Sequence, residues 1–123
     1  VLLLVMVRCV SDPDATPACS ATISIAKLPY LTGAESTASA GWLSSLQAEN
    51  RRAEQQLQNI DAFKQHPYFQ LLFDPQTAGG LLAALPDNQV DACLDELRHS
   101  DCTQARIIGS ISVSNSDSRV ILQ

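Results

Sequence analysis

Hydrophobic and polar positions along the chain follow two different periods, which predict strands interspersed with helices. The opening segment Val1–Val10 is short and almost entirely apolar, with Arg8 as its one charged residue, so its pattern fits either a strand or a buried helix. The tract Ser11–Ser20 is rich in Pro, Asp and small polar residues and is predicted to be a loop. Residues Ala21–Leu28 alternate between the two classes, as a half-buried strand requires, and Pro29 ends the run.

Two helices are predicted in the middle of the chain. Thr32, followed three residues later by Glu35, matches a capping box, which predicts a helix over Gly33–Ala40. Gly41 follows the predicted helix directly, and glycine readily adopts the left-handed backbone conformation that often ends a helix. The stretch Gln47–His66 is rich in good helix formers and is predicted to be a second helix.

Short apolar runs predict four strands in the C-terminal half, around one helix. Gln70–Asp74 and Gly80–Leu85 are the first two predicted strands, and Ala105–Val113 and Arg119–Leu122 are the last two. The last two are joined by the turn-like Ser114–Ser118, which predicts a hairpin.

The helix between these pairs of strands is predicted to begin with Asp87 as its cap. It presents one apolar stripe at helical spacing, made of Val90, Cys93, Leu94 and Leu97.

This order of elements predicts an α/β fold, an α+β two-layer sandwich with a mixed sheet covered by helices. The turn Pro75–Gly79 is too short for a parallel crossover, so the two strands that it joins are expected to be antiparallel or to diverge. At 123 residues, the whole of 1–123 is expected to form one domain.

Charge and composition exclude several classes of partner. Thirteen acidic residues outnumber eight basic ones, and no basic stripe marks a nucleic-acid interface. The opening apolar run stops at Arg8, whereas a membrane span needs about 20 apolar residues, so no membrane contact is expected. No secretory signal precedes the cysteines and none forms a Cys-x-x-Cys pair, so we expect a cytoplasmic protein with reduced thiols at Cys9, Cys19, Cys93 and Cys102.

The segment that begins at Asp74 carries the chemistry-bearing residues. Asp74 is an acid that could hold a metal or a water, and Gln76 and Thr77 add polar side chains. Gly79 and Gly80 have no Cβ atom, so they expose consecutive N–H donors that suit a phosphorylated or otherwise anionic ligand. The Lys and the glycine spacing of a Walker A loop are absent. The alternative is a tight turn in which the Asp binds its own backbone.

The same segment resembles the signature of a known family. Leu72–Leu82 reads Leu-Phe-Asp-Pro-Gln-Thr-Ala-Gly-Gly-Leu-Leu, which is very similar to the Asp-Pro-Gln-Thr-Ser-Gly-Gly-Leu-Leu of selenophosphate synthetases (selenide, water dikinases). This family belongs to the aminoimidazole-ribonucleotide-synthetase-like superfamily. Leu28–Ala34, Asn50 and Ile107–Gly109 resemble further family positions in the right order. Ala78 departs from the family Ser, so a hydroxyl contact from that position is absent.

The resemblance implies that the chain is the C-terminal domain of a longer enzyme and lacks the N-terminal ATP-binding domain. Such an enzyme, a homodimer, converts selenide, ATP and water into selenophosphate with the aid of Mg²⁺. The N-terminal domain is this chain's implied partner, and the C-terminal domain closes over the cleft. Substrate or phosphate contacts are expected from five residues, Asp74, Gln76, Thr77, Gly79 and Gly80.

The family's nucleophile and nucleotide loop lie in the missing domain. No cysteine of this chain matches the nucleophile, so we assign no catalytic residue and no metal ligand here. We therefore expect the chain alone to be inactive and to bind no ATP or Mg²⁺ by itself.

Two alternatives stay open on the sequence. The chain could be the equivalent domain of a sister ATP-dependent synthetase or kinase, although the Asp-Pro-Gln-Thr text is not expected there. It could also be a non-catalytic α/β binding or regulatory module. A Cys or selenocysteine with its Lys upstream of Val1 would exclude the second alternative.

Overall fold

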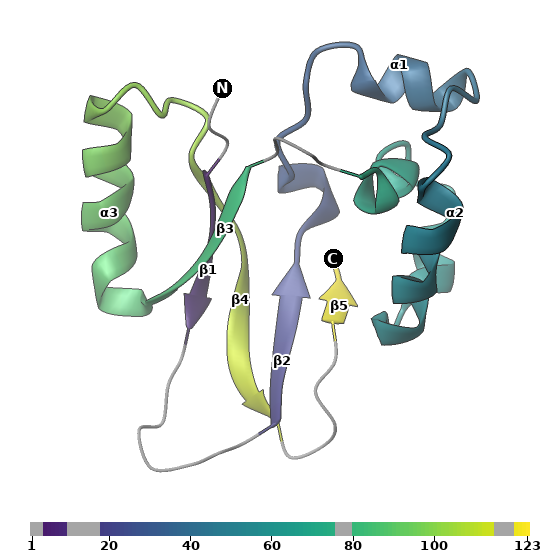
Figure 1. Cartoon of the computed structure of the whole chain (residues 1–123). Coiled ribbons are helices and arrows are strands. Elements are labelled where there is room, and N and C mark those ends of the chain that lie inside the picture. Colours follow the sequence, from purple (N-terminus) through teal and green to yellow (C-terminus); the bar gives the residue numbers. More distant parts are fainter. Residues whose placement is uncertain (1–3, 10–17, 76–79, 115–119) are drawn as a thin grey trace.

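A computed structural model describes residues 4–9, 18–75, 80–114 and 120–123 (Figure 1). These residues form a five-stranded sheet with the strand order β3-β1-β4-β2-β5. The strands are β1 (Leu4–Cys9), β2 (Ala18–Ile23), β3 (Leu81–Pro86), β4 (Arg106–Ser114) and β5 (Val120–Leu122).

The sheet is mixed, as the sequence predicts. Strand β1 is parallel to both β3 and β4, whereas β2 is antiparallel to β4 and parallel to β5. The predicted α/β fold with a mixed sheet is thereby confirmed. The predicted hairpin of β4 and β5 is wrong, because β2 pairs with β4 along Gly109–Ser114 and separates β4 from β5.

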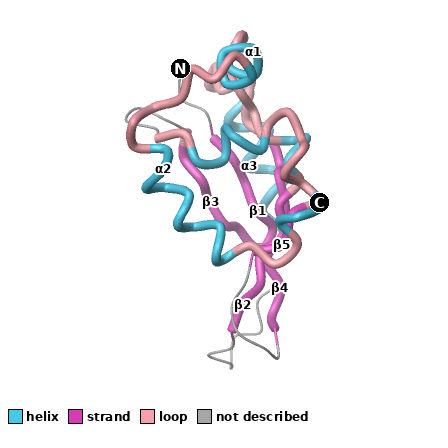
Figure 2. The backbone as a smooth tube through the Cα atoms, turned by 90° about the vertical axis from the view of Figure 1, so that its right-hand side faces the viewer, coloured by secondary structure: helices cyan, strands magenta, loops and turns pink. Residues whose placement is uncertain are grey.

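The helical elements lie beside the two ends of the sheet (Figures 1 and 2). Helix α3 (Asp87–His99) contacts β1 and β3. At the β2–β5 end lie two short α-helices and four 3₁₀ segments. They are η1 (Ile25–Lys27), α1 (Ala34–Ser39), α2 (Gln47–Asn50), η2 (Arg51–Gln56), η3 (Ile60–Ala62) and η4 (Phe69–Phe73).

The described core is divided in the same way as the helices. One cluster joins Val90 and Leu94 of α3 to Ala105. A larger cluster at the other end of the sheet is built on Ile25, Phe69, Phe73 and Leu122. In β4, Ile107 packs against the first cluster, whereas the next residue, Ile108, packs with Ile23, Leu28 and Ile111. The central strand therefore holds both halves of the molecule together.

Helix α3 and strand β3 follow their sequence patterns closely. The predicted apolar stripe is confirmed, since Val90 and Leu94 are buried and Cys93 and Leu97 pack against them. Pro86, rather than Asp87, is the N-cap residue, and Asp87 is the first helical residue. Strand β3 begins at Leu81, one residue from the predicted start.

The opening run is a strand, and the strand predicted over Ala21–Leu28 is displaced. Leu4–Cys9 form β1, which settles the strand-or-helix ambiguity. Strand β2 starts earlier, at Ala18, and ends at Ile23, after which η1 begins. The chain turns there because Ser24 N–H donates to the Ile108 carbonyl and Ile25 N–H donates to the Gln123 carbonyl.

The predicted capping box at Thr32 does not form. Gly33 is the N-cap residue of α1, with φ at 90°, and no side chain caps the helix. The helix end is as predicted: Gly41 adopts φ 81°, and its N–H donates to Ala38 while Trp42 N–H donates to Thr37. This pair of bonds is a Schellman motif, which the left-handed conformation of Gly41 makes possible.

Two further predictions fail because tertiary contacts override local propensity. The single helix expected over Gln47–His66 breaks at Leu57, which is extended and pairs with Val120 beside β5. The strand expected over Gln70–Asp74 is the 3₁₀ segment η4, in which Phe69 and Phe73 are both buried. A spacing of four residues places two side chains on one face of either a helical turn or a strand, so the sequence pattern alone did not separate the two.

Gly109 occupies the tightest point in the sheet. A Cβ atom at this position would overlap the backbone carbonyl of Thr22 in β2. The register of β4 against β1 also shifts here, so that Ile107 and Gly109 pair with successive residues of β1. Only glycine allows β2 to approach β4 this closely at the bulge.

On the outer edge of β5, the side-chain amide of Asn59 makes the backbone hydrogen bonds that a neighbouring strand would make. Asn59 Nδ2 donates to the Leu122 carbonyl at 2.6 Å, and Leu122 N–H donates to Asn59 Oδ1 at 2.9 Å. Gln58 N–H donates to the Val120 carbonyl at 3.0 Å. The short last strand is thereby held on both sides.

Within the described ranges, no helix is long and apolar enough to cross a membrane.

We predict that Gly109→Ala lowers the free energy of unfolding by about 3 kcal/mol, because the added methyl group forces β2 away from β4. Urea unfolding measures the change. Ser110→Ala, at an exposed position in the same strand, is the control and is expected to change stability by less than about 0.5 kcal/mol. Equal stability of the two variants would contradict the close approach.

We predict that Asn59→Asp destabilises the chain by about 2 kcal/mol at neutral pH, since the carboxylate cannot donate to the Leu122 carbonyl and repels it. The matched control is Gln58→Glu, which makes the same charge change at the neighbouring, exposed side chain. Thermal unfolding of both variants provides the measurement. A Gln58→Glu loss as large as that of Asn59→Asp would show that charge, and not the paired amide, is responsible.

Candidate functional site

The structure describes the two ends of the candidate anion-binding segment Asp74–Gly80, one after η4 and one before β3. Asp74 is the C-cap residue of η4, is partly buried and has an extended backbone with φ −69° and ψ 127°. Gly80 is exposed and immediately precedes β3. Three of the predicted site residues, Gln76, Thr77 and Gly79, lie outside the described residues.

Helix α2 holds η4, and with it the position of Asp74, through two side-chain amides. Gln47 Nε2 donates to the Gln70 carbonyl at 2.7 Å, and Asn50 Nδ2 donates to the Phe73 carbonyl at 3.1 Å. Gln47 is only 3% exposed, so its bond is shielded from water. The second bond is made to the residue directly before Asp74.

Arg51, the first residue of η2 and the C-cap of α2, adds a third connection to η4. Its guanidinium carbon lies 5.9 Å from the centroid of the Phe69 ring and 5.7 Å from that of Phe73. Its Nη1 donates to Gln70 Oε1 at 3.1 Å, and its Nε donates to Glu54. The cation–π contacts and the hydrogen bonds fix the orientation of the two buried rings.

These contacts turn a 3₁₀ segment of five residues into a rigid support for Asp74. Sequence reasoning noted Asn50 only through the family resemblance and did not single out Gln47 or Arg51. The sequence did contain one indication that Gln47, Asn50 and Arg51 act together: residues at i, i+3 and i+4 share one face of a helical turn. Which segment that face contacts could not be read from the sequence.

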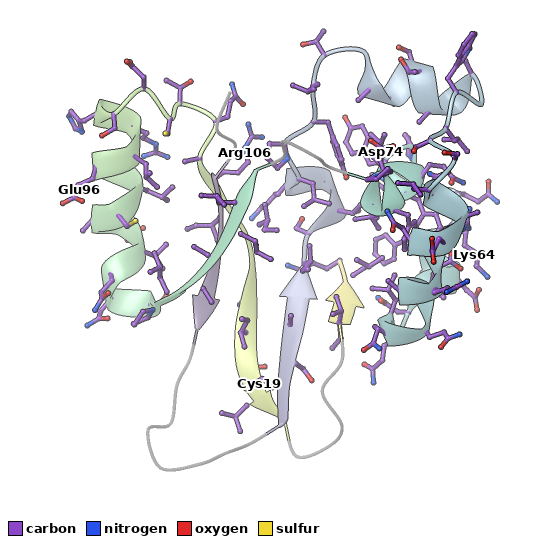
Figure 3. The ribbon with its side chains drawn as sticks, in the orientation of Figure 1. Cys19, Lys64, Asp74, Glu96 and Arg106 are labelled. Atoms are coloured by element: carbon purple, nitrogen blue, oxygen red, sulfur yellow. The ribbon has the colours of Figure 1, made fainter. Side chains whose placement is uncertain are left out.

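A hollow of about 330 Å³ opens at the side of η4 where Tyr68 lies. Its wall is formed by the backbone and side chains of Leu28–Gly33, together with Tyr68 and Arg106. Figure 3 shows Arg106 and Asp74 at about the same height in the view, with Asp74 on the side of the η segments. No sequence pattern predicted this hollow, since its residues come from three distant parts of the chain.

Tyr30 is the unusual residue of the hollow. Its ring lies 4.5 Å from that of Tyr68, centroid to centroid, and its hydroxyl oxygen is buried without a hydrogen-bond partner. Burial, and to a smaller degree the neighbouring Tyr68, raises the pKa of the Tyr30 hydroxyl above its ordinary value. The hydroxyl is therefore protonated at neutral pH and can act as a donor.

Other chemistry-bearing residues of the described part do not assemble into a centre. Across its ranges, no three His, Cys, Asp or Glu side chains are grouped so that they could hold a metal ion. Cys93 and Cys102 are free thiols that pack against the α3 cluster. His66 accepts a bond from the Tyr68 N–H at 3.2 Å, and His99 Nδ1 lies 2.6 Å from the Asp95 carbonyl.

Comparison with known proteins gives one informative similarity. No protein-family profile matches the chain, and no solved structure matches it. Over 100 residues the chain is 26% identical to selenide, water dikinase 2 of Peptoclostridium acidaminophilum. The match covers 81% of this chain and 28% of that protein, so the chain spans less than a third of its relative's length. The similarity indicates a relationship to selenophosphate synthetases.

Proposed function

We propose that this chain is the C-terminal domain of a selenophosphate synthetase, whose full-length form makes selenophosphate from selenide, ATP and water. The observation that carries the proposal is the sequence motif Leu72–Leu82, in a chain that is similar over most of its length to a selenide, water dikinase. In this proposal the domain contributes one wall of the active-site cleft.

The geometry at both ends of the segment supports a role in binding. Asp74 leaves a 3₁₀ segment held by Gln47 and Asn50, and Gly80 enters β3, which is paired with β1 along its length. A ligand-binding turn gains affinity when its ends are fixed before the ligand arrives. We propose that Thr77 and the amides of Gly79 and Gly80 contact the phosphate or selenium species. Gln76 would add a polar contact, and Asp74 would orient the turn or a water.

The remainder of the chemistry is assigned to the parent enzyme. The described residues of this chain supply no group of carboxylates for Mg²⁺. We therefore propose that ATP and Mg²⁺ are held by the N-terminal domain, where the metal would stabilise the charge of the phosphates. On this proposal the chain has no catalytic residue of its own, and the parent is a cytoplasmic homodimer.

Exposed apolar residues support a contact with that N-terminal domain. Leu31 and Trp42, on either side of α1, are 73% and 78% exposed, and Leu46 before α2 is 53% exposed. On β3, Ala83 and Leu85 are partly covered, whereas Leu82 is 65% exposed on the alternate face. Large exposed apolar side chains in more than one place favour a partner surface.

We predict that Asp74→Asn and Thr77→Val in the full-length enzyme each lower kcat/KM for selenophosphate formation by about tenfold to a hundredfold, because each removes a polar contact in the cleft. Coupled measurement of AMP and selenophosphate gives the rates. Asp61→Asn is the matched control, since Asp61 is an exposed acid paired with Lys64 and lies outside the segment. Unchanged turnover in both site variants would remove the segment from the active site.

We also predict that residues 1–123 alone do not hydrolyse ATP, with or without selenide and Mg²⁺, because the proposal assigns the nucleophile and the nucleotide loop to another domain. Release of AMP and orthophosphate by the purified chain is the measurement. The Asp74→Asn variant, prepared in the same way, controls for a contaminating ATPase. Activity in the native chain that the variant lacks would show that the chemistry resides in this domain.

A further inference from the structure

The hollow beside Tyr68 is lined by a cation, Arg106, that forms no ion pair with an acid in the described part of the chain. Arg106 lines the hollow, and its Nη2 and Nε donate to the side chain and carbonyl of Gln104 at 2.6 and 3.3 Å. Among the described residues, no acid lies within ion-pair distance of this guanidinium. Gln104 holds the group in place without cancelling its charge, so the guanidinium keeps a charge that an oxyanion can pair with.

Aromatic and apolar side chains form one part of the lining, beside the polar residues Thr32 and Glu35. The rings of Tyr30 and Tyr68 lie at 50° to each other, and Leu28, Pro29 and Leu31 complete the lining on one side. Leu31 is 73% exposed at the rim of the hollow. A flat apolar ring bound here would cover apolar surface that otherwise faces water.

The buried hydroxyl of Tyr30 is a second and independent sign of a ligand. Buried polar atoms without a partner are rare in folded proteins, and each one calls for a physical reason. The Tyr30 ring lines the hollow while its hydroxyl has no acceptor. A ligand oxygen that reaches this hydroxyl would supply the missing acceptor.

The volume of the hollow and the charge of Glu35 restrict the kind of ligand that fits. The volume of about 330 Å³ is at the small end of the roughly 300–1,000 Å³ range of small-molecule sites. Glu35, exposed at the rim, disfavours ligands with a large negative charge. A single-ring compound with one anionic group fits both limits.

We propose that this hollow binds a small aryl anion, in which one phosphate or carboxylate group is attached to a flat ring. The anion contacts Arg106, and the ring packs against Tyr30, Tyr68 and Leu31. None of the described residues that line the hollow belongs to the Asp74–Gly80 segment, so the variants that test one proposal leave the residues of the other unchanged.

The experiment is a titration of the ¹⁵N-labelled chain 1–123, followed by amide chemical shifts. Phenyl phosphate and benzoate are the probes, and inorganic phosphate and phenol are the half-ligands that carry only one of the two features. At least one probe is expected to shift the amides of residues 28–33, Tyr68 and Arg106, and to bind about tenfold more tightly than either half-ligand. The stronger probe identifies the preferred anion. Absence of localised shifts with both probes, or equal binding by a half-ligand, overturns the proposal.

Two charge variants test the electrostatics. Arg106→Gln is expected to weaken binding of the stronger probe by about tenfold or more. Arg98→Gln, on the exposed surface of α3, removes the same charge elsewhere and is expected to leave binding unchanged. Glu35→Gln is expected to strengthen binding severalfold. Equal weakening by Arg106→Gln and Arg98→Gln would mean that only net charge matters, which would overturn the site.

Tyr30→Phe tests the hydroxyl separately from the fold. Because the hydroxyl has no partner without ligand, its removal is expected to preserve or raise the melting temperature of the free chain. The same variant is expected to lose at least threefold in affinity for the probe. A lower melting temperature with unchanged affinity would show that the hydroxyl is structural and would remove it from the site.

Discussion

The close approach of β2 to Gly109 is the constraint on which the rest of the structure depends. Gly109 lies in β4, the central strand, which pairs with β1 on one side and with β2 on the other. Directly before it, the Ile108 carbonyl accepts the Ser24 N–H, so the chain leaves β2 and enters η1 at a fixed point. The position of Leu28–Gly33, and therefore of one wall of the hollow, follows from this exit. A side chain at position 109 would separate the two halves of the sheet.

The second support is the set of polar contacts between α2 and η4. A 3₁₀ segment of five residues has few stabilising bonds of its own, so its position depends on its neighbours. Gln47 and Asn50 satisfy two of its carbonyl groups, and Arg51 spans the rings of Phe69 and Phe73. Because the rings belong to the larger core cluster, the segment that carries Asp74 is tied to the hydrophobic core.

The candidate segment and the hollow therefore meet at one element, η4. Tyr68, at the start of η4, lines the hollow, and Asp74, at its end, begins the segment that resembles the selenophosphate synthetase signature. At roughly 2 Å per residue, the six steps from Tyr68 to Asp74 along a 3₁₀ segment span about 12 Å. The two candidate regions therefore depend on the same contacts that hold η4 in place.

The sequence by itself determined the elements whose signals are local. The apolar stripe of α3, the mixed α/β class, the left-handed Gly41 and the candidate segment at Asp74 were all readable, because residues a few positions apart set each pattern. The tertiary structure decided that β5 joins β2 and not β4, that Leu57 breaks a helix, and that η4 replaces a strand. It also brought Tyr30, Tyr68 and Arg106 around one hollow. Contacts such as that of Asn59 with Leu122 join residues far apart in the chain, and their energies override local propensity only once the fold has formed.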